Sequence, residues 1–343
     1  MKKTLALLSL LLSLALMFSA CGTKTPSNAP ADEPEETTAA PLADISIGFL
    51  QGPTGMGAAY LLQNNADGKT AAHYNVQIAS DPTSFTASLI NGELDMAALP
   101  VNAAATLYAK TEGKVQILAV NTLGVMYILD ASGTVSSLAD LKGKTVLSAG
   151  QGSSPEYVLN YLLEENGLTP GEDVTVEYAA EHAEVVAQAL AGKYDAVLLP
   201  EPFVTKIQQK NDAFKVAVDL TEEWNELGSG ELLTGCIAVR TAFAAEHPAE
   251  INAFLADYEA SVNYVLENTD DAAALMGSFG IIEEETAKHA LPNCNITFMA
   301  GEEMAANVNA YLGVLAEADP ASVGGSVPGD DFYCLTADTS NAK

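Results

Sequence analysis

Positive charge is scarce in this sequence. Of its 343 residues only 15 are Lys or Arg, whereas 45 are Asp or Glu, so the formal net charge is −30. A surface this acidic repels a phosphate backbone, which excludes nucleic acid as a partner. Hydrophobic residues make up 48% of the chain. That content argues against a disordered protein, and the length suits two domains or one two-lobed unit.

Motifs for metal binding, redox chemistry and catalysis are also missing. The four Cys include no CxxC pair and the four His include no HExxH or HxH pair, so the sequence predicts no disulfide framework, no metal site and no cofactor. GPTGMG lacks the ending of a P-loop, and AGQGSSPE is not a nucleophile elbow. We therefore expect a protein that is not an enzyme. Cys236, Cys294 and Cys334 are expected to be buried thiols, with one disulfide as the alternative.

The one long apolar run stands at the N-terminus. Lys2 and Lys3 precede the Leu-rich run of residues 5–18, which is too short for a comfortable membrane span and is followed by small residues. This pattern is typical of a secretory signal peptide, which we place at residues 1–20. No later segment approaches the length of a membrane span.

Cys21 directly follows Ser19 and Ala20, as in the lipobox of bacterial lipoproteins, although Phe18 stands where Leu is usual. We expect Cys21 to carry a lipid, and the alternative is ordinary cleavage beside an incidental Cys. Residues 21–43 are rich in Pro, Ala, Thr and acids, which predicts a flexible tether. The body would then hang at the extracytoplasmic face of the cell membrane.

The body contains an internal repeat with an offset of 100 residues. Gln51-Gly52 recurs as Gln151-Gly152, and NGELDMAALP at residue 91 recurs as AGKYDAVLLP at residue 191. Each copy has the pattern strand, glycine-rich turn, helix, strand, helix, strand, proline turn, helix. Alternating strands and helices predict a parallel sheet covered by helices, so two copies predict two similar α/β lobes.

Two apolar runs, at residues 115–130 and 232–240, are predicted to be crossover strands between the lobes. We assign residues 44–125 and 238–335 to the first lobe, 126–237 to the second, and 336–343 to a frayed tail. Apolar residues recur at helical spacing in 248–268 and again in 301–316, which predicts two further helices. Ser153 is expected to cap the helix that starts in the second glycine-rich turn.

Three sequence segments carry a family resemblance: SLADLKGKTV, QGSSPEYVLNYLLEENGL and YDAVLLPEPFV. With the lipoprotein signal and two crossover strands, residues 44 to about 335 resemble the type II periplasmic binding protein fold, in the branch that binds nitrate, sulfonates, taurine and thiamine-precursor pyrimidines. The resemblance implies a monomer that captures a small molecule between two lobes. It also implies delivery to an ABC permease with a cytoplasmic ATPase. The alternative is a tethered receptor that senses its ligand without import.

Ligands of open parallel sheets bind beyond the carboxyl ends of the strands, where each turn leads into a helix with free N–H groups. The repeat places such turns in both lobes, although each could simply be a well-capped turn. The residues predicted to bind the ligand are Gly52, Pro53, Thr54, Gly55, Thr83, Ser84, Pro100, Asn102, Asn121, Gln151, Gly152, Ser153, Ser154, His182, Glu201, Trp224 and Thr234.

The predicted turns contain no Lys or Arg, so a guanidinium grip on an anion is absent. Acids stand near them, at Asp81, Glu156, Glu181 and Glu201. This favours a neutral or cationic ligand such as a nitrogen heterocycle. The alternative is a small anion, such as a sulfonate or nitrate, held by helix N-termini alone. In that case the acids would serve only to stabilise the positive ends of the helices. Trp224 could stack on a planar ligand or fill a lobe surface.

Overall fold

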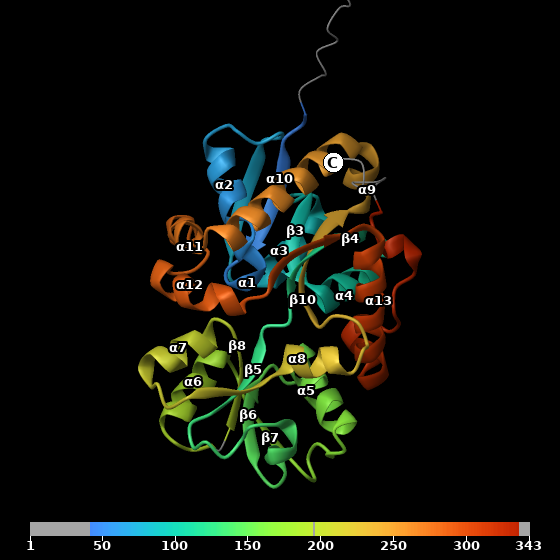
Figure 1. Ribbon diagram of the computed structural model, residues 1–343. Coiled ribbons are helices and arrows are strands. Elements are labelled where there is room, and N and C mark those ends of the chain that lie inside the picture. Colours follow the sequence, from blue (N-terminus) through green and yellow to red (C-terminus); the bar gives the residue numbers. More distant parts are fainter. Residues whose placement is uncertain (1–41, 195, 336–343) are drawn as a thin grey trace, which may run out of the picture. The chain divides into compact units, whose positions relative to one another are not determined.

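The computed structural model describes residues 42–194 and 196–335, so the predicted signal peptide, Cys21, most of the tether and the tail lie outside the described residues. Within the described part, eleven strands form two sheets (Figure 1). We call each sheet with its covering helices a lobe. The first sheet has the order β11-β4-β10-β3-β1-β2 and consists of β1 (Ile45–Leu50), β2 (Tyr74–Ala79), β3 (Met96–Pro100), β4 (Val115–Leu123), β10 (Leu233–Arg240) and β11 (Ile296–Ala300). The second has the order β7-β6-β8-β5-β9 and consists of β5 (Met126–Asp130), β6 (Thr145–Ala149), β7 (Thr175–Ala179), β8 (Ala196–Pro200) and β9 (Lys215–Asp219).

Thirteen α-helices accompany these strands in the described residues. Those of the first lobe are α1 (Pro53–Met56), α2 (Ala59–Ala66), α3 (Pro82–Asn91), α4 (Val101–Lys110), α9 (Thr241–Glu246), α10 (Pro248–Glu267), α11 (Thr269–Ser278), α12 (Glu284–Ala290) and α13 (Gly301–Ala318). Those of the second are α5 (Ser154–Glu165), α6 (His182–Leu190), α7 (Phe203–Lys210) and α8 (Leu220–Glu226). Short 3₁₀ helices span Leu138–Leu141, Leu291–Asn293, Pro320–Val323 and Asp330–Phe332. Of the described helices, none is long and apolar enough to span a membrane.

The repeat is confirmed in the pairing of the strands. β1 pairs in parallel with β2 and β3, and β6 pairs in parallel with β7 and β8. The helices α3 and α6 occupy matching positions, and each is followed by a glycine with positive φ, at Gly92 and Gly192. A left-handed glycine releases the chain from the helix toward the next strand, which explains why the repeat keeps it.

The sheets are mixed, so the prediction of wholly parallel sheets is incomplete. β10 runs antiparallel to β3 and β4, and β5 runs antiparallel to β8 and β9. The chain crosses from β4 to β5 at Gly124 and Val125 and returns after α8. Each strand that follows a crossing starts where the parallel strands end, and it must therefore run in the opposite direction. β10 belongs to the first sheet from Leu233 onward. In the sequence analysis the chain returns to the first lobe at residue 238, and those lobe boundaries stay a prediction.

The predicted C-terminal helices are confirmed as α10 and α13. The apolar stripe of α10, including Phe254 and Tyr258, is buried against the first sheet beside Phe49 and Tyr74. Ser153 stands at the N-cap position of α5, as predicted, but its hydroxyl donates to the carbonyl of Gly150 and makes no capping hydrogen bond to the helix. Among the described residues, Cys236, Cys294 and Cys334 are free thiols.

Candidate functional site

The carboxyl ends of the parallel strands in both sheets open onto one cavity of about 440 Å³. This is the edge at which open parallel sheets bind ligands. The two crossings between the lobes also reach it. We call this cavity the cleft, and the residues that line it are Pro100, Asn102, Ala103, Val125, Met126, Gly150, Ser153, Ser154, Pro155, His182, Pro200, Leu233, Thr234 and Tyr311.

Three helices begin at the cleft. α4 starts directly after Pro100, α5 after Ser153 and α6 with His182, and no side chain of the capping residue closes any of these ends with a hydrogen bond. The first-turn N–H groups of a helix have no partner within it and form the positive end of the helix dipole. The cleft therefore presents three sets of polarised N–H groups from two lobes.

Of the residues that the structure describes, no Lys, Arg, Asp or Glu lines the cleft. Its titratable side chains are His182 and Tyr311. Burial lowers the pKa of His182 and raises the pKa of Tyr311 to about 12, so both are neutral near pH 7. The ring of His182 packs on Phe203 with 5.3 Å between the centroids, and its buried Nδ1 has no hydrogen-bond partner among the described residues. The hydroxyls of Ser154 and Thr234 and the amide of Asn102 complete a polar but uncharged lining.

A second groove, of about 530 Å³, is lined by the β1–α1 turn, the α11–α12 loop and the start of α7. Glu201 lines it and is only 2% exposed. Its carboxylate accepts hydrogen bonds from the backbone N–H and the hydroxyl of Thr205, both 3.1 Å long, and burial raises the pKa of this carboxyl. The acid is thus bound within the protein and does not face the cleft.

The predicted site residues divide into three groups. The cleft brings together Pro100, Asn102, Ser153, Ser154, His182 and Thr234, and the second groove contains Gly52, Pro53 and Glu201, with Gln51 beside them. Eight residues line neither cavity: Thr54, Gly55, Thr83, Ser84, Asn121, Gln151, Gly152 and Trp224. Among these, Asn121 is buried and donates to the carbonyl of Thr54 over 2.9 Å, which holds α1 in place. Thr83 and Ser84 bond with Asp81 at the exposed start of α3.

The prediction that Trp224 contacts the ligand is wrong. It belongs to α8 rather than a loop and is 0% exposed, and its indole N–H donates to the carbonyl of Gly230 over 3.1 Å. Its ring packs against Tyr161 and Tyr311. The alternative, that Trp224 fills the lobe, is the correct one. The acids expected near the ligand, such as Glu156, whose carboxylate accepts from the N–H of Gly152, do not line the cleft either.

Several cleft residues were not expected. Tyr311 reaches the cleft from α13, some 110 residues beyond the last predicted turn, and no local pattern distinguishes it from the buried residues of that helix. Val125, Met126 and Leu233 belong to the two crossings. Their neighbours at the crossings, such as Thr234, were predicted because crossover strands must pass the cleft, and the same reasoning could have included them.

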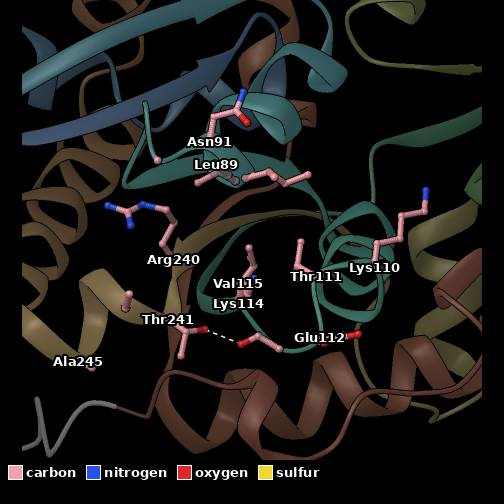
Figure 2. Close-up of a pocket in the computed structure, with 14 residues that line it drawn as sticks. Leu89, Asn91, Lys110, Thr111, Glu112, Lys114, Val115, Arg240, Thr241 and Ala245 are labelled. Carbon is pink, nitrogen blue, oxygen red and sulfur yellow. Dashed lines mark hydrogen bonds between the residues drawn. The ribbon is translucent and has the colours of Figure 1, made fainter.

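A third cavity, of about 880 Å³, lies at the opposite edge of the first sheet, where its parallel strands begin; Figure 2 shows the residues that line it. Lys110, Lys114 and Arg240 line it, and the hydroxyl of Thr241 donates to the carbonyl of Gly113 across its floor over 2.8 Å. The Arg240 guanidinium is held by Asp95 at 2.6 Å. This cavity faces away from the convergent helix ends, so it is not the candidate site.

A family model described as the periplasmic substrate-binding protein of a phosphonate ABC transporter matches residues 61–290. The chain belongs to this family. It is therefore a periplasmic-type substrate-binding protein of an ABC transporter, and the family consists of transport proteins rather than enzymes. A comparison with curated protein sequences found no match.

Solved structures of similar fold agree with this assignment. An ABC transporter protein from Parabacteroides distasonis has 22% identity and a TM-score of 0.71, covering 84% of this chain and 98% of that one. The aliphatic sulphonate binding protein SsuA from Escherichia coli has 19% identity and a TM-score of 0.66, covering 82% and 95%. SsuA from Xanthomonas axonopodis, bound to MOPS, has 15% identity and a TM-score of 0.60, covering 87% and 97%. At these identities the likeness shows a shared fold, the two-lobed periplasmic binding protein fold expected from the sequence.

Proposed function

We propose that this substrate-binding protein captures a small solute with an oxyanion head group, of the sulfonate or phosphonate class, and delivers it to an importing permease and its ATPase. The observation that carries the proposal is the convergence of three helix N-termini, those of α4, α5 and α6, on one uncharged cleft. Helix N-termini bind anions through their free N–H groups and dipoles without any basic side chain. The family description and the sulfonate-binding neighbours support the same ligand class.

This proposal reverses the order of preference drawn from the sequence. A neutral or cationic ligand was favoured because the turns lack Lys and Arg and four acids stand near them, and none of the four acids lines the cleft. A neutral nitrogen heterocycle stays a second candidate, since the lining carries no charged side chain and includes apolar Val125, Met126 and Leu233. A ring with carbonyl oxygens could accept hydrogen bonds from the same helix ends.

Isothermal titration calorimetry of the purified protein separates these candidates. Methanesulfonate, methylphosphonate, nitrate and the zwitterionic sulfonate taurine form the anion series, and pyrimidine and purine bases form the neutral series. The proposal predicts binding within the anion series, in the micromolar range or tighter. Binding of a base with no response to any anion would overturn it. A tethered receptor without import would bind the same ligand, and uptake of that ligand in cells with and without the protein distinguishes the two roles.

We also propose that a lipid on Cys21 anchors the protein outside the cell membrane. The proposal is supported by the sequence around Cys21 and by the periplasmic character of the family. Replacing the thiol, as in Cys21→Ser, removes the lipid attachment point and should shift the protein from the membrane pellet to the soluble fraction. Retention of this variant on the membrane would contradict the anchor, and Cys334→Ser serves as a control that should stay bound.

A further inference from the structure

A short segment of the first lobe lies against the first crossing between the lobes. It consists of residues 291–295, and we call it the clamp. The side-chain amide of Asn295 donates to the carbonyl of Gly124 over 2.6 Å, and the N–H of Leu123 donates to the carbonyl of Asn295 over 3.0 Å. Leu123 ends β4 and Gly124 follows it. The clamp therefore holds the chain at the point where it leaves the first sheet.

The same segment is bonded to the second lobe. The hydroxyl of Tyr127, in β5, donates to the carbonyl of Asn293 over 2.8 Å. The side-chain amide of Asn293 donates to the carboxylate of Glu201 over 3.4 Å, and the N–H of Glu201 donates back to the carbonyl of Val125 over 3.0 Å. These bonds close a ring that joins the clamp, β5 and the turn after β8.

Tyr127 and Glu201 lie away from bulk water in this ring, whereas the side chain of Asn293 is exposed. Tyr127 and Glu201 are 6% and 2% exposed, and Cys294, between the two clamp asparagines, is buried. Hydrogen bonds in such surroundings resist opening, because an unpaired polar group left behind would lose water as well as its partner. Glu201 is paired within its own lobe to Thr205, and Asn293 is its hydrogen-bond donor from the first lobe among the described residues.

We propose that the clamp is a third, non-covalent connection between the lobes, which sets the angle at which they rest. In this fold the lobes rotate about the two crossings. A hydrogen bond between the lobes near the rotation axis favours molecules with one angle between the lobes over molecules with other angles. The bonds of Asn293 to Tyr127 and Glu201 span the two lobes, whereas those of Asn295 only brace the crossing. Loss of the spanning bonds should therefore release the lobes without unfolding either of them. The proposal goes beyond ligand capture and does not depend on the ligand's identity.

Small-angle X-ray scattering of the purified protein, with no ligand added, tests the clamp. Tyr127→Phe removes the hydroxyl and keeps the ring in the core, and Asn293→Ala removes the bond to Glu201. The double variant should shift the radius of gyration and broaden the distribution of interatomic distances, with each single variant in between. Tyr194→Phe is the matched control, since its hydroxyl bonds to Glu177 and Gln188 within the second lobe. Its scattering should equal that of the wild type.

Amide hydrogen exchange supplies the second readout. The N–H of Glu201 takes part in the ring, and the N–H of Leu123 donates to the neighbouring Asn295 of the clamp. Exchange of both should accelerate several-fold in the double variant while the core of each sheet stays protected. Unchanged scattering and unchanged exchange at both amides would overturn the proposal, as would an equal change in the Tyr194→Phe control. If Asn293→Ala lowers the melting temperature, Tyr127→Phe alone decides the question. None of these measurements requires ligand binding, so failure of the proposed function would leave their outcome unaffected.

Discussion

His182 determines how the charge of the cleft depends on pH. Its pKa is lowered by burial, and no Lys, Arg, Asp or Glu in the described part of the chain lines the cavity around it. The neutral imidazole offers one donor and one acceptor, whereas the protonated ring offers two donors and a positive charge. Because the folded-state pKa lies below the unfolded value, His182 opposes folding only as the pH falls through about 6.5 toward the lowered value.

A bound anion would raise the pKa of His182, so binding should take up a proton. The affinity for methanesulfonate should therefore rise as the pH falls from about 7.5 to about 5.5, across the ordinary pKa of histidine. Calorimetry at both pH values measures this change. In His182→Gln, which keeps a hydrogen-bonding amide but does not titrate, the dependence should vanish. A wild-type affinity that is constant over this range would contradict direct contact between His182 and the ligand.

Single residues also show where sequence reasoning succeeds. Asn102 and Ser154 were placed in the cleft because the end of a parallel strand fixes the position of the next residues whatever their identity. Thr234 was placed there because a crossover strand must pass the cleft. Trp224 was misplaced because its burial depends on α5 and α13, which pack over α8. Neither contact can be predicted from the residues near Trp224 in the sequence. The acids were misjudged for a related reason. Glu201 turns inward to Thr205, which the sequence alone does not reveal.

At the scale of elements, the repeat predicted most of the fold. Each copy carries the order and spacing of its strands and helices, so β1 to α4 and β6 to α7 followed from the pattern. The direction of β5 and β10 did not, because it depends on which edge of the sheet the chain reaches after crossing. The contribution of α13 to the cleft did not follow either, since long-range packing places it there.

The packing of α1 against β10 is tight enough to predict a stability change. A methyl group at Gly235 would lie 2.5 Å from the Asn121 side-chain oxygen and even closer to the Thr54 methyl. Gly235→Ala should therefore destabilise the protein by about 1–3 kcal/mol, as overpacking of a core does. Gly313→Ala is the matched control, because a methyl group at this position in α13 would have no other atom within 4 Å. It should stabilise by roughly 0.5–1 kcal/mol through helix propensity.

Urea unfolding of the two variants measures both effects. A Gly235→Ala protein as stable as the wild type would show that α1 can move away from β10 at little cost. The turn that leads into α1 also lines the second groove. If α1 can move in this way, the shape of the second groove can change with it.

At the scale of the whole molecule, an acidic protein presents an uncharged, polarised cleft. The chain as a whole has a net charge of −30, whereas no Lys, Arg, Asp or Glu of the described residues lines the cleft. In the proposed function, fixed N–H groups would provide the attraction for an anion without the desolvation that a buried cation would require. The strands of both sheets direct these helix ends to one place, which is how two copies of one motif produce a single site.

The most direct test of this account is calorimetric titration of methanesulfonate into the wild type and three variants. Asn102→Leu and Ser154→Leu each place a bulky apolar side chain at a helix end in the cleft. Asn91→Leu makes the same kind of change at the cavity of about 880 Å³ shown in Figure 2, away from the cleft. We predict that the two cleft variants lose binding at nearly unchanged melting temperature and that Asn91→Leu binds like the wild type. Unaltered affinity in both cleft variants would contradict the assignment of the site.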